Sequence, residues 1–222
     1  MKPGIFKIEK FCPMRAGMTV SRSAKLLPQD AVSPGNVSVT WFSNGADTSI
    51  LPECYDTWVF YLGETGEGMF RRPDADIMKF GKDDLLAVSP NTLCGVESRS
   101  GLLYTEIIMQ REIIMNESIK SGEVLRLKEL VSYEKDSIVN IDLAKNDAMK
   151  MALMAFDEGT GLQPHRAPGN AIVTALEGSA VIGYEGVDYE ISEGESFRFE
   201  KNGLHSVTAK GRFKMSLILV LD

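Results

Sequence analysis

The chain has 222 residues, 44% of them hydrophobic, and a formal net charge of −7 from 24 basic and 31 acidic side chains. So acidic a balance offers no broad positive field for phosphate backbones, which excludes nucleic acid as an expected partner. No run approaches the ~18 apolar residues of a membrane span, and the N-terminus lacks the apolar core of a secretory signal. We therefore expect a cytoplasmic protein with no membrane partner.

The three cysteines, Cys12, Cys54 and Cys94, form an odd and sparse set. A secreted disulfide scaffold is denser in cysteine, so we expect buried, reduced thiols. A thiolate pair or a disulfide between Cys54 and Cys94 stays open as an alternative.

The first half of the chain alternates short extended patterns with turn residues. Two extended patterns occupy 4–11 and 18–27. β-Branched, aromatic and apolar residues then predict strands at 37–42, 57–62, 77–80, 85–88 and 102–109. The glycine-rich run from Gly63 to Gly68 is acidic, so it would repel phosphate and is predicted to be a turn. Almost no helical periodicity accompanies these strands, which favours a sandwich or barrel.

The middle of the chain is polar, and residues 119–131 are the one segment expected to form a helical turn or two. Strands resume beyond it, and we predict them at 137–143, 148–156, 180–183, 189–191 and 213–221. The polar stretch is the best candidate for a connection between two domains. We therefore expect an N-terminal lobe over 1–115, a linker over 116–130 and a C-terminal lobe over 131–222.

Both histidines of the chain fall in a regular arrangement of glycines. Gly159 is followed by five residues and then His165, Gly178 closes that segment, and Gly194 precedes His205 by eleven positions. This spacing resembles the two sequence motifs of the cupin superfamily. The resemblance implies an all-β fold of double-stranded β-helix (jelly-roll) barrels, with the two histidines as ligands of a divalent metal ion such as zinc, iron, nickel or manganese. The motif's second histidine falls on Ala167 and its glutamate on Ala171.

The two halves of the chain resemble a diverged internal repeat. Residues 90–94 align with 201–205, with Cys94 in the place of His205. Cys54 precedes Cys94 by 40 positions, as His165 precedes His205 (94 − 54 = 205 − 165). We interpret the chain as two cupin lobes in tandem, the first lacking histidine ligands.

The predicted site lies in the C-terminal lobe. His165 and His205 are its expected metal ligands, with Asn170 as a third through its amide oxygen, and Glu200, Glu158 or Gln163 as alternatives by proximity in sequence. The remaining residues that we expect to contact a bound molecule are Gln163, Arg166, Tyr184, Phe197, Phe199 and Glu200. The alternative for the histidines is a pair satisfied by hydrogen bonds near the core.

Three functional hypotheses follow. In the first, the C-terminal barrel binds a small polar metabolite, with the imidazoles as hydrogen-bond donors or as ligands of the ion. In the second, a metal-dependent isomerase or dioxygenase uses Glu200 or Tyr184 as its proton carrier. In the third, a structural protein retains vestigial pockets. Barrel edges and the extended N-terminal segments favour a homodimer formed by strand exchange.

Overall fold

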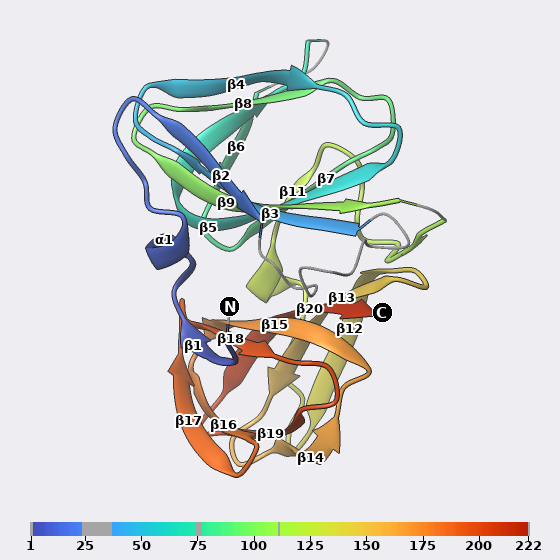
Figure 1. Ribbon diagram of the computed structural model, residues 1–222. Helices are drawn as coiled ribbons and strands as arrows, with labels where there is room; N and C mark the ends of the chain where they lie inside the picture. Colours follow the sequence, from blue (N-terminus) through green and yellow to red (C-terminus); the bar gives the residue numbers. More distant parts are fainter. Residues whose placement is uncertain (1, 24–36, 74–76, 111, 222) are drawn as a thin grey trace.

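The protein is described by a computed structural model, which covers residues 2–23, 37–73, 77–110 and 112–221. In these residues the chain forms twenty strands, one four-residue helix and one short 3₁₀ turn, arranged as two barrels that pack against each other through their main sheets (Figure 1). The expected all-β jelly-roll fold is confirmed. The described part of the chain contains no helix long and apolar enough to span a membrane.

The N-terminal lobe is a barrel whose main sheet has the strand order β11-β7-β5-β9-β3-β2. A second layer, formed by β4 and β8, closes the barrel, because β8 pairs with both β4 and the far end of β5, and β6 pairs with β5 as well. Its strands are β2 (Thr19–Ser23), β3 (Val37–Asn44), β4 (Thr48–Glu53), β5 (Trp58–Arg71), β6 (Met78–Gly81), β7 (Asp84–Val88), β8 (Cys94–Ser98), β9 (Leu102–Met109) and β11 (Val124–Arg126).

The predicted turn at Gly63 to Gly68 is wrong, because these residues lie inside the long strand β5. The run is glycine-rich for a steric reason: a Cβ on Gly63 would lie 1.7 Å from the carbonyl oxygen of Gly81, and one on Gly66 would lie 2.2 Å from that of Gly101. Glycine therefore lets β5 bend past two other backbones and pass from one layer of the barrel to the other.

The C-terminal lobe has the same construction. Its seven-stranded sheet has the order β1-β18-β15-β20-β13-β12-β10, and a four-stranded sheet, β14-β19-β16-β17, faces it. Its strands are β1 (Gly4–Phe6), β10 (Ile114–Met115), β12 (Ile138–Lys145), β13 (Met149–Phe156), β14 (Gly161–Arg166), β15 (Gly169–Glu177), β16 (Ser179–Tyr184), β17 (Val187–Ser192), β18 (Ser196–Phe199), β19 (Leu204–Ala209) and β20 (Phe213–Leu221).

The strand orders match the expected internal repeat. The run β2-β3-β9-β5-β7 of the first lobe corresponds to β12-β13-β20-β15-β18 of the second. One more strand extends each run: β11, from the segment between the two repeats, pairs with β7, and β1, from the N-terminus, pairs with β18. The N-terminal strand therefore completes the C-terminal lobe, and the strand exchange that suggested a homodimer takes place between lobes of one chain.

Residues 116–130, which we predicted to be a linker, contain β11 and the 3₁₀ turn η1 (Leu127–Glu129). Extended structure was expected at 4–11, but only Gly4–Phe6 is a strand, and Ile8–Phe11 forms the helix α1. Of the extended pattern at 18–27, the structure describes β2, and residues 24–27 lie outside the described residues.

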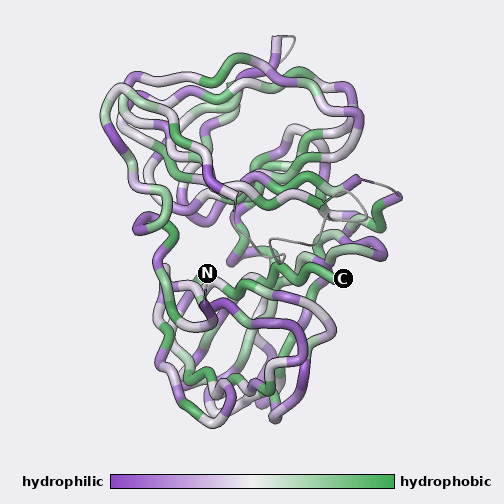
Figure 2. The backbone as a smooth tube through the Cα atoms, viewed as in Figure 1, coloured by the Kyte–Doolittle hydropathy of each residue, from purple (hydrophilic) through white to green (hydrophobic). Residues whose placement is uncertain are grey.

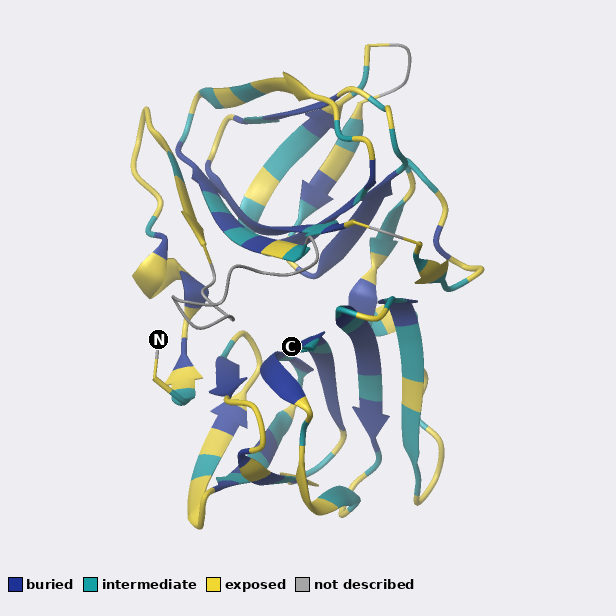
Figure 3. Ribbon diagram, turned by 45° about the vertical axis from the view of Figure 1, so that its right-hand side comes forward, coloured by how far each residue is buried: buried dark blue, intermediate teal, exposed yellow. Residues whose placement is uncertain are grey.

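A hydrophobic core joins the two lobes. Trp41, Leu62 and Ile107 of the first lobe belong to one buried cluster with Ile172 and Ile218 of the second. Figure 2 shows these apolar stretches along the strands that face the other lobe, and Figure 3 shows that the facing strands are largely buried. Burial of this kind is the dominant stabilising term in folding, so the lobes stabilise each other.

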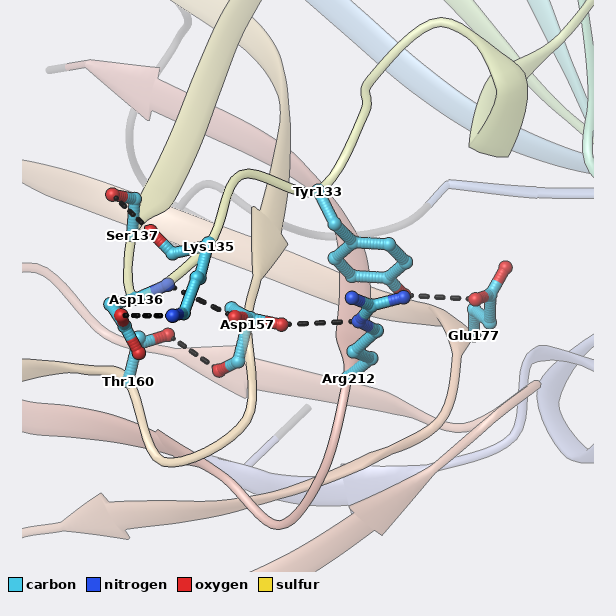
Figure 4. Close-up of polar contacts among 8 residues, drawn as sticks. All are labelled: Tyr133, Lys135, Asp136, Ser137, Asp157, Thr160, Glu177 and Arg212. Atoms are coloured by element: carbon cyan, nitrogen blue, oxygen red, sulfur yellow. Dashed lines mark hydrogen bonds and ion pairs between the residues drawn. The ribbon is translucent and has the colours of Figure 1, made fainter.

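Tyr133 lies in the segment that leads into the C-terminal lobe, and polar contacts surround its side chain. The hydroxyl of Tyr133 donates a hydrogen bond to the Glu177 carboxylate at 2.9 Å. Arg212 lies over the Tyr133 ring, 5.2 Å from its centroid, and also pairs with Asp157 at 3.1 Å (Figure 4). Lys214 lies 4.6 Å from the same centroid. These contacts fix the connecting segment against the barrel wall.

Candidate functional site

The two histidines meet across a pair of antiparallel strands. His165 on β14 is the direct register partner of His205 on β19. Residues directly opposite each other in an antiparallel pair project to the same face. Accordingly, the imidazole centroids are 4.2 Å apart, with their planes inclined by 52°.

A β-bulge turns His165 toward the barrel interior. The register of β14 against β19 shifts between Leu162 and His165, so three positions on β14 are matched by two on β19. In a regular strand, residues three positions apart such as Leu162 and His165 would project to opposite faces, and the bulge brings them to the same face. Pro164 lies in the bulge, where a strand tolerates the missing backbone N–H. We did not predict this bulge, and the proline immediately before the histidine was its sequence signal.

Each imidazole is held by a backbone carbonyl two residues earlier. Nδ1 of His165 lies 2.8 Å from the carbonyl oxygen of Gln163, and Nδ1 of His205 lies 2.9 Å from that of Gly203. A carbonyl only accepts hydrogen bonds, so Nδ1 of each ring is the donor, and Nε2 is the ring nitrogen left for a ligand. We expected the imidazoles to donate hydrogen bonds to a bound molecule, and in this arrangement their Nδ1 atoms face the backbone, which leaves Nε2 to contact a ligand or a metal ion.

Aromatic side chains surround the inner histidine. His205 is buried and its ring centroid is 4.5 Å from that of Phe199, while His165 is exposed at the end of the barrel. Tyr184, on β16, is also a direct register partner of His205. Its ring packs against Phe197 and Phe199, and its hydroxyl accepts a hydrogen bond from the backbone N–H of Glu200 at 3.4 Å. Of the residues expected to contact a bound molecule, Tyr184 and Phe199 therefore lie beside His205, and Phe197 packs against both of them.

Burial controls the protonation of this site. It lowers the pKa of His205 below its ordinary value, the carbonyl of Gly203 opposes that shift, and the charge of His165 adds to it. Burial also raises the pKa of the Tyr184 phenol. At neutral pH the site thus contains a neutral His205 and a protonated phenol, without a fixed charge on either group.

Asn170 is not brought to the histidine pair. It is buried on β15, and its Oδ1 accepts a hydrogen bond from the backbone N–H of Lys201 at 3.3 Å. Alternation along β15 places Ala171 and Val173 inside the barrel, and Asn170 with Ile172 on the opposite face. The prediction of Asn170 as third metal ligand therefore lacks support in the geometry.

Three further predicted residues also point elsewhere. The Glu200 carboxylate pairs with Arg198 at 3.1 Å, on the face opposite to Phe197 and Phe199. Arg166 hydrogen-bonds the carbonyl of Asn202 and lies 3.6 Å from the Glu185 carboxylate, outside the barrel. The side chain of Gln163 is exposed, and its backbone carbonyl contributes to the site.

The cysteines differ from our expectation in one respect. Cys12 and Cys94 are buried free thiols, but Cys54 is exposed. The register partner of Cys94 is Glu53, so the repeat equates Glu53, and not Cys54, with His165.

A divalent ion finds two protein ligands here. In the described part of the chain, no group of three or more His, Cys, Asp or Glu side chains is arranged to hold a metal ion. The two Nε2 lone pairs fit such an ion, but a typical site supplies three or four ligands. The donor set is thus suited to weak binding, with the other positions left to water or to the bound molecule.

Comparisons with known proteins agree with this architecture. Residues 152–221 match the family model of the cupin domain. None of the curated proteins matches the chain. The chain is similar to a solved cupin 2 conserved barrel domain protein from Leptotrichia buccalis, with 26% identity and a TM-score of 0.84 over 99% of this chain and 98% of that one.

The chain is also similar in fold to salicylate 1,2-dioxygenase from Pseudoaminobacter salicylatoxidans. A mutant of that enzyme gives 10% identity and a TM-score of 0.68, over 99% of this chain and 84% of that one. Its adducts with gentisate give 11% identity and the same TM-score of 0.68, over 99% and 81%. Identities this low show a shared fold alone.

Proposed function

The chain belongs to the cupin superfamily, and on that basis we propose that its C-terminal barrel binds a small polar metabolite at His165 and His205. The observation that carries the proposal is the arrangement of the two rings, which face each other in direct register with both Nδ1 atoms engaged. Two neighbouring imidazoles with Nε2 left for a ligand favour either a divalent ion or two hydroxyl groups of one molecule.

A metal ion is compatible with this proposal. His165 and His205 would hold it through Nε2, with the carbonyls of Gln163 and Gly203 orienting the rings from behind, as outer partners of metal-bound histidines usually do. A bound ion would polarise a carbonyl or enediol oxygen of the metabolite. The apolar wall around Phe199 would exclude water and strengthen polar contacts inside the barrel.

Binding is better supported than catalysis. An isomerase or dioxygenase activity requires a proton carrier, and we named Glu200 and Tyr184 for that role. The Glu200 carboxylate pairs with Arg198 on the opposite face, and burial keeps the pKa of Tyr184 above its ordinary value, which makes the phenol a poor base at neutral pH. The solved adducts of salicylate 1,2-dioxygenase with gentisate support the general point that this scaffold accommodates a small polar ligand.

The decisive experiment combines metal analysis with a ligand screen on protein purified without an affinity tag. We expect nickel, zinc, iron or manganese, or a polyol or carboxylate from a metabolite panel, to raise the midpoint of thermal unfolding. His205→Ala and His165→Ala should abolish the shift. Gln163→Ala is the matched control and should retain it, because Gln163 contributes only its backbone.

A substoichiometric metal content after exposure to all four ions would exclude the metal-bound form. Absence of any shift across the metabolite panel at millimolar concentration would exclude the binding function as a whole. We further propose that the protein acts in the cytoplasm and self-associates, which size-exclusion chromatography with light scattering would test.

A further inference from the structure

The first lobe carries polar groups where the second carries its histidines. Glu53 on β4 is the direct register partner of Cys94 on β8, as His165 is of His205. The same β-bulge precedes Glu53, because the register shifts between Ile50 and Glu53, and Pro52 lies in it as Pro164 does. Glu53 is exposed at the barrel end and Cys94 is buried inside, which repeats the arrangement of the two histidines.

A buried carboxyl lies deeper in the same barrel. Glu106 on β9 is 5% exposed and projects to the same face as Tyr104 and Ile108, which line the barrel interior. Its direct register partner on β5 is Tyr61. The corresponding register pair in the second lobe is Val173 with Leu217. The first barrel thus has a carboxyl and a phenol where the second has two apolar side chains.

Most of these carboxyl and hydroxyl groups have no hydrogen bond to another described residue. Glu53 accepts a hydrogen bond from the hydroxyl of Tyr55 at 2.7 Å. For Glu106, and for the hydroxyls of Tyr61 and Tyr104, no hydrogen bond or ion pair is found within the described ranges. Tyr104 is 1% exposed and Tyr61 is 4% exposed. None of their polar atoms belongs to the fully buried, unpartnered atoms of the described residues, so these three groups are open to water or to a bound molecule inside the barrel.

The electrostatics of the interior select the charge of that molecule. Burial, together with the negative charge of Glu53, raises the pKa of Glu106 to about 7. Burial also raises the pKa of the Cys94 thiol to about 11, and the charge of Arg72 opposes that shift. Among the described residues, the charge that acts on Glu106 is the negative charge of Glu53, and no cation is found beside it. A ligand with a positive charge would relieve both effects.

Aromatic rings favour an organic cation over a metal ion. Tyr104 stacks on Phe42 with 5.3 Å between centroids, and Tyr61 lies edge-on to Tyr104 at 5.8 Å. The faces of such rings attract ammonium groups. The described residues provide no cluster of three metal-ligating side chains in this barrel.

We propose that the N-terminal barrel is a second binding site, which takes a small protonated amine between the carboxyl groups of Glu106 and Glu53 and the rings of Tyr61 and Tyr104. Its chemistry is the opposite of that of the C-terminal site, whose imidazoles offer lone pairs to a metal ion or hydroxyl groups. One chain would therefore bind two ligands of different classes.

Calorimetric titration of the full chain with butylammonium and with tetramethylammonium tests this proposal, with butanol and butyrate as the neutral and anionic counterparts. We expect at least one cation to bind with one molecule per chain, and neither counterpart to do so. Glu106→Leu should weaken cation binding at least about tenfold. Leu217 occupies the corresponding place in the second lobe, so this variant introduces a side chain that the fold accommodates.

Two control variants locate the effect. Glu123→Gln, at an exposed carboxylate of the same lobe, should bind the cation as the parent chain does. The double variant His165→Ala/His205→Ala should also retain it, which separates this site from the C-terminal one. The proposal is overturned if neither cation binds at millimolar concentration, if butyrate binds as well as butylammonium, or if folded Glu106→Leu retains the parent affinity.

Discussion

The ring of Tyr184 lies directly against the backbone of Gly203. A Cβ on Gly203 would be 2.6 Å from both Cε2 and the hydroxyl oxygen of Tyr184, closer than real side chains approach. Gly203 also supplies the carbonyl that orients His205. The glycine thus couples the position of the aromatic wall to that of the inner imidazole.

Gly203→Ala should therefore displace the Tyr184 ring and break its hydrogen bond with the Glu200 N–H. We expect a loss of stability of about 1–3 kcal/mol, as for other overpacked sites, and weaker binding of ligand or metal by roughly tenfold. Urea denaturation and thermal shift measure the two effects. Gly211→Ala is the control, because no atom lies within 4 Å of its added methyl group. Unchanged binding in Gly203→Ala would contradict the coupling.

Glu64 should make the junction of the lobes sensitive to pH. It lines a cavity of about 20 Å³ between the lobes, where it accepts a hydrogen bond from Thr105 at 2.6 Å. Burial raises its pKa to about 7, the Thr105 hydrogen bond opposes this, and the charge of Asp83 adds to it. The folded state therefore binds the proton more tightly than the unfolded state. It follows that Glu64 reduces stability as the pH rises from about 4.5 to about 7.

Glu64→Gln should remove this dependence. We expect the variant to match the parent chain near pH 4 and to exceed it by about 2 kcal/mol at pH 8, after allowance for solvent in the cavity. Urea denaturation across this range measures the difference. Glu67→Gln, at an exposed carboxylate of the same strand, should follow the parent chain at every pH. A constant difference between Glu64→Gln and the parent would show that Glu64 does not titrate as described.

Tyr133→Phe should destabilise the entry into the C-terminal lobe. The change removes the hydroxyl that donates to Glu177 but keeps the ring beneath Arg212 and Lys214. A loss of about 1 kcal/mol is expected for the hydrogen bond, and Tyr133→Leu should lose a further 0.5–1 kcal/mol, roughly the value of an exposed cation–π contact. Equal destabilisation by both variants would exclude a contribution from the cation–π contacts. Tyr189→Phe serves as a control, since its ring packs against Phe197 without a described hydrogen bond.

Phe6→Ala should weaken both lobes at once. Phe6 is buried in the core that joins them, and its ring is 5.9 Å from that of Trp41. We expect a loss of about 3–5 kcal/mol, the usual cost of truncating a buried phenylalanine. Phe11→Ala, whose side chain is 40% exposed, should cost clearly less. Two separate unfolding transitions in the parent chain would contradict the view that one core unites the lobes.

The spacing of glycines and histidines was sufficient to predict the barrel and the meeting of His165 with His205. It was insufficient for the rest of the site, because proximity in sequence does not specify the face of a strand. Asn170 and Arg166 are each adjacent in sequence to a residue that faces the interior, and each projects to the other face. Glu200 follows the last residue of β18 and pairs with Arg198. A β-bulge such as that in β14 exchanges the inward-facing and outward-facing positions over the rest of the strand.

The first lobe was harder to predict for a related reason. Matching Cys54 with His165 by equal spacing missed the true counterpart, Glu53, by one residue. Glu106 gave no motif signal at all, since it lies within an apolar strand whose pattern indicated burial on both faces. Only the pairing of β9 with β5 reveals that a carboxyl and a phenol share the interior.

The pairing of β1 with β18 joins residues near the two ends of the sequence, Ile5 with Phe197. During synthesis, β1 therefore has to remain without its partner until nearly the whole polypeptide has emerged, and a contact so distant in sequence slows the final step of folding. The barrel that contains Phe197 and the histidines is closed only at that late step. Premature termination anywhere before β18 would thus release a product whose N-terminal strand has no edge to join.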